Sequence, residues 1–129
     1  MENALRAHLI DWLRADPALT GLLNAIAEEA PLRTAPPWLG LVASASADWS
    51  TKDRKGREVR VALELHCRTD SAADTFSLAT AIEDRVESLP PAQPGFHIAS
   101  VHFLRARVEQ RPGNLRALLI EYRFRLMAN

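Results

Sequence analysis

The sequence predicts an α+β protein: a mainly antiparallel sheet of about four to five strands with two helices packed on one face. Residues 58–68 alternate between apolar side chains and side chains that are polar or, at Ala62, small, which is typical of a strand with one buried face. Residues 4–15 and 72–89 instead carry apolar side chains at spacings of three and four, which indicates helices. The expected strands follow one another through hairpins with few crossover helices, and this favours antiparallel pairing.

The first expected element is a broken helix. Residues 4–15 are amphipathic, with Asn3 as the expected N-cap. The Asp16-Pro17 pair interrupts the helix, because the residue before a proline is disfavoured in the helical region. Pro17 then opens a second short helical piece with Asp16 as its cap. Residues 24–30 fit either a helix or a short edge strand.

A proline-rich loop, residues 31–37, leads into two expected strands. Residues 38–46 indicate a strand of mostly small side chains, and the polar residues 48–56 indicate the hairpin loop that follows. The next strand, 58–68, is the clearest element of the sequence. Its expected buried face consists of Val59, Val61, Leu63, Leu65 and Cys67.

The second helix and the last two strands complete the fold. Ser71 and Asp74 resemble a capping box at the start of the helix, and Pro90-Pro91 ends it. Two strands, 97–108 and 115–127, are joined by a turn at 111–114 that combines proline, glycine and asparagine. The expected apolar stripe of the helix consists of Phe76, Ala79, Ile82, Val86 and Leu89. The expected buried face of the last strand consists of Leu118, Ile120, Tyr122, Phe124 and Leu126.

Composition limits the possible classes of protein. The chain has 129 residues, which fits a single domain spanning 1–129. Sixteen lysines and arginines balance sixteen acidic residues, so the formal net charge is zero. A protein that binds nucleic acid over its whole surface would be clearly basic, and the sequence argues against that class. Low self-repulsion favours association instead.

Nothing in the sequence requires an oxidising compartment or a membrane. Cys67 is the only cysteine, so no internal disulfide is expected. The start of the chain lacks the pattern of a secretory signal. The uncharged stretch 34–47 has 14 residues, fewer than the ~20 that cross a bilayer. We therefore expect a cytoplasmic protein without a membrane partner.

The residues that carry chemistry in enzymes are not arranged here as a recognisable site. The histidines form no HxH or HExxH pattern, and the glycines form neither a P-loop nor a GxGxxG motif. Cys67 is expected as a small buried hydrophobe, and Glu83, Asp84 and Glu87 as a solvated helix face. No catalytic residue, metal or cofactor is therefore expected. The four histidines are His8, His66, His97 and His102.

Charge is unevenly distributed along the chain. Residues 1–31 and 70–90 hold ten acidic residues and three arginines, whereas 97–129 hold six arginines and two glutamates. The helices are therefore acidic, and the sheet and its loops are basic. One interpretation is a pair of complementary surfaces that align subunits. The other is a sheet whose solvent face uses Arg and Glu pairs across strands.

Two tryptophans lie outside the periodic stripes. Trp38 follows the proline-rich loop, and Trp49 lies in the charged hairpin. Tryptophan is enriched at interface hot spots, which makes both candidates for partner contacts. The alternative is that Trp38 packs at the edge of the core.

In the order and spacing of its motifs the chain resembles the tail-terminator, or tail-completion, family of long-tailed phages and gene transfer agents. The resemblance covers nearly the whole chain. It depends on Ala15-Asp16-Pro17-Ala18-Leu19 after the opening helix, Ala35-Pro36-Pro37-Trp38-Leu39 at a strand entry, a polar loop with Trp49 and Gly56, the alternating strand 59–68, the helix 72–89, and Ile120-Glu121-Tyr122-Arg123-Phe124-Arg125 in the last strand.

The resemblance implies a virion structural protein and not an enzyme. Such a protein would assemble in the bacterial cytoplasm as a homo-oligomeric, hexameric ring, cap the tail tube and join it to the head-side connector protein, without sequence-specific binding of nucleic acid. Rings arise when a head-to-tail contact closes. The hairpin from Lys52 to Arg57 would then be an arm that orders on the tail tube protein or the connector. The candidate interface residues are Trp38, Trp49, Lys52, Arg54, Lys55, Arg57, Asp84, Glu87, Arg123 and Arg125.

Two other functions remain open from the sequence. A small α+β ligand-binding domain or unrecognised enzyme would need a pocket with converging polar groups. A nucleic-acid-binding module would need stacking aromatics on the basic sheet face; Phe103 and Tyr122 are the nearest, and Tyr122 is expected on the buried face. The loose candidates for a ligand site are His66, Arg68, His102 and Arg105.

Overall fold

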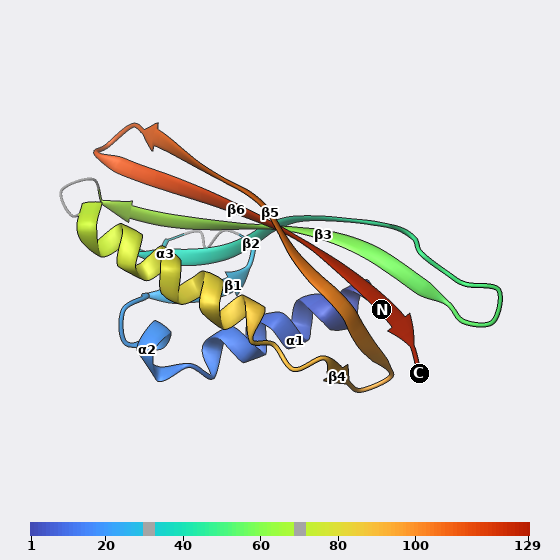
Figure 1. Ribbon diagram of the computed structural model, residues 1–129. Coiled ribbons are helices and arrows are strands. Elements are labelled where there is room, and N and C mark those ends of the chain that lie inside the picture. The colour runs from blue at the N-terminus through green and yellow to red at the C-terminus, as the bar shows by residue number, and fades with distance from the viewer. Residues whose placement is uncertain (30–32, 69–71) are drawn as a thin grey trace.

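A computed structural model describes residues 1–29, 33–68 and 72–129, and it has the α+β architecture that the sequence predicts (Figure 1). Within these residues, a six-stranded sheet has the order β1-β2-β3-β6-β5-β4. The sheet is larger than expected because two short strands, β1 and β4, extend its edges. The elements are α1 Glu2–Arg14, α2 Pro17–Thr20, β1 Ala25–Glu28, β2 Trp38–Asp48, β3 Gly56–Arg68, α3 Ala72–Glu87, β4 Ala92–Gln93, β5 Phe96–Arg111 and β6 Leu115–Ala128.

Both long helices cover the same face of the sheet, and the core lies between the two layers (Figure 1). We call this face the helix side and the opposite one the open face. The alternation in β3 and β6 places their apolar residues on the helix side, as predicted, where Leu63 pairs with Ile120 and Val61 with Tyr122. All four side chains are almost completely buried. Burial of this kind is the main stabilising contribution to the fold.

Helix α1 differs from the prediction at its start. It begins at Glu2 with Met1 as N-cap, so the prediction of Asn3 as N-cap is wrong. Asn3 lies inside the first turn, where its side-chain oxygen accepts a hydrogen bond from Arg6. Glu2 in the first turn favours this earlier start, because a negative charge is stabilised there by the helix dipole. The Asp16 cap of α2 is confirmed: its carboxylate accepts from the Ala18 N–H at 3.0 Å.

Residues 25–28 form β1, which decides between the two alternatives in favour of an edge strand. β1 runs parallel to the first residues of β2. Helix α1 holds the strand in place, because Arg14 donates to the Ile26 carbonyl at 2.7 Å and Arg6 pairs with Glu28 at 2.9 Å. These contacts come from a separate element, and local sequence pattern does not reveal them.

A reciprocal clamp joins α1 to α3. The Trp12 indole donates to the Arg85 carbonyl at 2.9 Å, and the Arg85 guanidinium donates to the Trp12 carbonyl at 2.9 Å. The guanidinium also lies 3.5 Å from the centre of the indole ring. This clamp turns the arginine of α3 toward α1 and away from the neighbouring acidic residues.

The apolar stripe of α3 is confirmed except at Phe76. Ala79, Ile82 and Val86 are buried, but Phe76 is 56% exposed. In a helix, position 76 lies in one row with positions 80, 83 and 87, which flanks the buried row of positions 75, 79, 82 and 86. The prediction of Phe76 as a core residue is therefore wrong. The expected cap at Ser71 lies outside the described residues.

Two hairpins project from opposite ends of the sheet (Figure 1). The β5–β6 hairpin turns at Gly113 and Asn114, whose φ values of 81° and 62° confirm the predicted turn chemistry. The β2–β3 hairpin turns through residues 49–55, which we call the hairpin loop. Neither hairpin end is covered by a helix, so both are available to a partner.

Candidate subunit interface

The hairpin loop is held by its own hydrogen bonds. Trp49 N–H donates to the Gly56 carbonyl at 3.0 Å, and the Ser50 hydroxyl accepts from Gly56 N–H at 3.0 Å. At the tip, Thr51 N–H donates to the Arg54 carbonyl at 2.9 Å. A Cβ at position 56 would lie 2.4 Å from the Trp49 carbonyl oxygen, so only glycine fits this close approach. The loop is therefore built as a defined structure.

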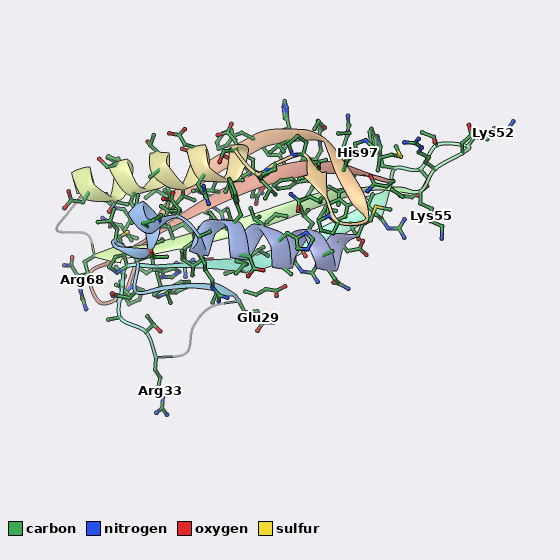
Figure 2. All side chains as sticks on the ribbon, turned by 90° about the horizontal axis from the view of Figure 1, so that it is seen from below. Glu29, Arg33, Lys52, Lys55, Arg68 and His97 are labelled. Atoms are coloured by element: carbon green, nitrogen blue, oxygen red, sulfur yellow. The ribbon has the colours of Figure 1, made fainter. Side chains whose placement is uncertain are left out.

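The tip of the hairpin loop carries positive charge toward solvent. Figure 2 shows Lys52 and Lys55 reaching away from the body of the protein. Lys52, Arg54 and Lys55 are exposed, and in the described part of the chain their side chains make no ion pair. Arg57, at the base, is used internally by Asp48 at 3.6 Å and Glu2 at 3.7 Å. The cations that remain free for a partner are those at the tip.

Asp48 shows how the base of the hairpin differs from its tip. Its carboxylate accepts a hydrogen bond from the Ser50 hydroxyl at 2.6 Å. This bond, together with the charge of Arg57, lowers the pKa of Asp48 below its ordinary value. The acidic group at the base is thus already satisfied within the subunit, and it does not neutralise the lysines at the tip.

Glu83, Asp84 and Glu87 form an acidic flank on α3. Partial burial, followed by the neighbouring charges of Glu87 and Asp84, raises the pKa of Glu83. The Tyr122 hydroxyl donates to Glu87 at 3.2 Å, and burial with the nearby carboxylates raises the pKa of that tyrosine. Arg85 faces Trp12, so no cation among the described residues pairs with the acidic flank. A basic partner would relieve this repulsion.

Exposed apolar side chains lie close to the acidic flank. Phe103 of β5 is 41% exposed and packs edge-on against Tyr122, with 5.7 Å between ring centres. Val108, further along β5, is 49% exposed, and Phe76 lies on the row of α3 that flanks its buried row. Phe103 and Val108 stand on the helix side, opposite Tyr122 and Leu118. This uncovered strip is unusual for a soluble subunit and is typical of a contact surface.

The open face of the sheet is largely neutralised by ion pairs. Arg105 pairs with Glu121 at 2.8 Å, and Arg111 pairs with Glu109 at 2.9 Å. Arg125 pairs with Glu58 at 3.4 Å. The pairs Arg105–Glu121 and Arg125–Glu58 join neighbouring strands, as the interpretation of Arg and Glu pairs across strands predicts, whereas Arg111 and Glu109 belong to the same strand.

One arginine on the open face, Arg123, has no carboxylate partner among the described residues, whereas its neighbour Arg60 lies 4.0 Å from Glu58. Arg60 of β3 and His102 of β5 lie directly on either side of Arg123 in β6. The Arg123 Nε atom is buried without a hydrogen-bond partner, and no ion pair within the described residues reaches this side chain. Like charges placed opposite each other across a strand pair are destabilising.

The two candidate tryptophans have different surroundings. Trp38 is only 8% exposed and stacks on His66 with 4.0 Å between ring centres, which leaves little of its ring for a partner. Trp49 is half-buried, and the Arg125 guanidinium lies 5.5 Å from the centre of its ring. The contact places Arg125 at the base of the hairpin, next to the predicted arm.

The predicted interface residues fall into separate places. The hairpin loop, with Arg57 and Arg125 at its base, forms one group, and Asp84 and Glu87 of α3 form a second. Trp38 and Arg123 lie apart from both on the sheet. Sequence reasoning missed the exposed strip of Phe76, Phe103 and Val108. The exposure of Phe103 and Val108 depends on β5 lying near the sheet edge, and strand order is not visible in a local pattern.

The residues considered for a ligand site do not converge. His66 is engaged by Trp38 and Glu64, and Arg105 by Glu121. Arg68 lines an apolar groove of ≈ 480 Å³ between the end of β3 and the start of α3. No group of three or more metal-ligating side chains occurs in the described ranges. Of the helices that the structure describes, none is long and apolar enough to cross a membrane.

Comparisons with known proteins agree with this architecture. The family described as "Tail completion protein gp17" matches residues 7–127. The chain is also similar to a chain in a structure described as "Virion of native gene transfer agent (GTA) particle", with a TM-score of 0.80 and 23% sequence identity. That match covers 98% of this chain and 97% of the other, so the two share the entire fold. A search of curated proteins found no match.

Proposed function

Because the chain belongs to the Tail completion protein gp17 family, whose members are structural and not enzymes, we propose that it is a structural component of a phage or gene transfer agent virion. In this proposal it assembles as a hexameric ring, caps the tail tube and joins it to the head-side connector protein. Assembly takes place in the cytoplasm of the bacterial host, and the protein then remains in the tail. The observation that carries the proposal is the family match over residues 7–127.

The arrangement of surfaces supports a head-to-tail contact between copies. The cationic tip of the hairpin loop and the acidic flank of α3 lie in different parts of the subunit and do not neutralise each other. A contact between unlike patches is heterologous, and repeated heterologous contacts produce a ring when the rotation closes. Opposite charge on the two patches would set the register between neighbours.

The hairpin loop is the part of the subunit best placed to reach a second protein. It projects past the helices, and its internal hydrogen bonds hold Lys52 and Arg54 in a defined position. Besides the neighbouring subunit, its partner would be the tail tube protein or the connector. The roles of Trp38, Trp49, Arg123 and Arg125 in these contacts remain predictions.

Electron microscopy of the purified protein, alone and mixed with its tail tube protein, tests the assembly. We expect six-fold rings, either free or at the ends of tubes. A protein that stays strictly monomeric at high concentration and low salt, and also with tube protein present, would contradict the proposal.

Charge reversal tests the contact between hairpin loop and acidic flank. Lys52→Glu, Arg54→Glu and Lys55→Glu together should abolish or strongly weaken ring formation, whereas Lys52→Arg with Lys55→Arg should preserve it. Adding Asp84→Arg and Glu87→Arg to the reversed hairpin should restore assembly, because the charges are then exchanged. Unchanged ring formation by the reversed hairpin alone would remove the loop from the mechanism.

A further inference from the structure

The sheet has two edges that the subunit covers only in part. β1 pairs with β2 only at Trp38–Leu41, and β4 pairs with β5 only at Phe96 and His97. Beyond those positions, residues 42–48 of β2 and 99–111 of β5 have no strand on their outer side among the residues that the structure describes. Uncovered edges present backbone N–H and C=O groups that can pair with another strand.

The hydrogen bonds at the end of β2 show which groups point outward. Trp49 N–H donates to the Gly56 carbonyl at 3.0 Å, so Trp49 is directed toward β3. Successive residues of a strand direct their backbone groups to alternate sides. Ser44 and Ser46 therefore direct their N–H and C=O groups away from β3, into the open edge.

The same reasoning applies to β5. Ala128 N–H donates to a carbonyl next to the start of β3 at 2.8 Å, so even-numbered residues of β6 face β3 and odd-numbered ones face β5. Arg123 is thus directed toward its partner in β5, His102. The residues on either side of that partner, Val101 and Phe103, direct their backbone groups outward.

The two open edges run in opposite directions, as antiparallel pairing requires, and they include residues from the same row of the sheet. Each neighbouring pair in the series β2, β3, β6 and β5 is antiparallel, so β2 and β5 run in opposite directions. A rotation about an axis along the strands preserves these directions, and β2 of one copy would lie antiparallel to β5 of the next. Ser44, Val61, Tyr122 and Phe103 lie in one row of the sheet, so the two open segments overlap in height.

The side chains of the open β2 segment permit such pairing. The open segment of β2 reads Val-Ala-Ser-Ala-Ser-Ala-Asp and contains no lysine or proline, the residues that commonly protect an edge. Ser44 and Phe103 both stand on the helix side, because they share rows with Val61 and Tyr122. Pairing would keep the helices of both copies on one side of a continuous sheet and would cover part of the exposed Phe103 ring.

We propose that neighbouring subunits join by antiparallel pairing of residues 42–48 of β2 with the open segment of β5 in a second copy, so that the sheet continues from subunit to subunit. This inference rests on the proposed ring. The contact is heterologous, as ring closure requires. Backbone hydrogen bonds supply the attachment, and the hairpin loop and acidic flank add charge complementarity.

Proline substitutions at the two edges test this pairing. Ser46→Pro removes an outward N–H of β2, and Val101→Pro removes one of β5, which lies at the level of Ser46 when Ser44 and Phe103 share one row. Each variant should lose ring formation in sedimentation velocity and microscopy, while Ser46→Ala and Val101→Thr should retain it. An equal mixture of the two proline variants should form heterodimers and nothing larger, because each retains one intact edge.

Amide hydrogen exchange of the wild-type protein gives a second measurement that does not depend on the variants folding. Assembly should slow exchange at Ser44, Ser46, Val101 and Phe103. Rings that persist in both proline variants, with unchanged exchange at these amides, would overturn the edge pairing and leave the ring proposal intact. A wild-type protein that forms no oligomer, even on tail tubes, would overturn both.

Discussion

The two faces of the sheet differ at adjacent positions of the same strand. In β6, Ile120 and Tyr122 face the helices and are completely buried, whereas Glu121 and Arg123 face the opposite way and are half-exposed. The helix side is filled with apolar side chains whose burial stabilises the fold. The open face is occupied by ion pairs, and exposed pairs of this kind contribute little to stability.

This difference separates the folding of the subunit from its contacts with partners. Substitutions on the helix side are expected to change the free energy of unfolding, because they remove buried volume. Substitutions on the open face and along the edges are expected to change association much more than stability. The following predictions test that separation, beginning with the largest effect.

The largest change in the free energy of unfolding is expected at Ile120 of β6, and its neighbour Leu119 provides the comparison. Ile120→Ala should lower the free energy of unfolding by about 2–5 kcal/mol, because the side chain is fully buried in the core. Leu119→Ala, one residue away on the open face, should cost about 0.5 kcal/mol. Urea unfolding at a concentration where the protein is monomeric measures both. Equal losses would show that the open face is packed within the monomer.

The second largest loss of stability is expected at Gly56, at the base of the hairpin loop. Gly56→Ala should lower the free energy of unfolding by about 1–3 kcal/mol, because the new Cβ would lie 2.4 Å from the Trp49 carbonyl and 2.9 Å from the Leu126 carbonyl. Gly95→Ala is the control: its Cβ would meet nothing within 4 Å, but the φ of +87° adds backbone strain of its own. Thermal melting of both variants, with the resonance of the Trp49 indole N–H as a local probe, measures the effect. A displaced Trp49 resonance is expected only for Gly56→Ala, and its absence would contradict the close approach.

Much of the fold was predictable where one element alone determines the outcome. The period of two in β3, the cap at Asp16 and the turn at Gly113-Asn114 are local signals, and all three are confirmed. The exposure of Phe76 and the parallel strand β1 were not predictable, because they depend on which side of α3 and α1 meets the sheet.

The candidate interface was predictable only in part, for the same reason. Sequence pattern indicated the cations of the hairpin loop and the carboxylates of α3. It did not indicate the open edges at Ser46 and Phe103, because an edge is a property of strand order and not of any single strand.

The pH dependence of the melting temperature of two variants, one in the acidic flank and one on the open face, compares these two surfaces. Glu83→Gln should raise the melting temperature at pH 7 and leave it unchanged near pH 3. The pKa of Glu83 is raised above 4.5 in the folded state by partial burial and by Glu87 and Asp84, so ionising it opposes folding. This penalty is absent below the unfolded-state pKa and complete above the folded-state pKa.

Glu121→Gln should change the melting temperature at pH 7 in the opposite direction to Glu83→Gln. Hydrogen bonding to Arg105 lowers the pKa of Glu121 below 4.5, so its ionised form favours folding. The variant should therefore melt at a lower temperature at pH 7, and the difference should disappear as the pH falls through the lowered pKa. Shifts of the same sign in Glu83→Gln and Glu121→Gln would show that the two surfaces are not electrostatically distinct.

The smallest change in the free energy of unfolding is expected at Arg123, an arginine of the open face that has no acidic partner among the described residues. Arg123 lies opposite Arg60 and has a buried Nε without a partner, so Arg123→Glu should replace a repulsive pair with an attractive one. The free energy of unfolding should rise by about 0.5 kcal/mol, visible as a small upward shift of the melting temperature. Arg123→Gln, which removes the charge without reversing it, should give a smaller rise.

If the wild-type arginine contacts a partner, the more stable Arg123→Glu subunit should assemble less well. Calorimetry and sedimentation on the same samples would separate the change in stability from the change in assembly. A variant that is both less stable and fully competent to assemble would show that Arg123 stabilises the subunit through contacts unrelated to Arg60.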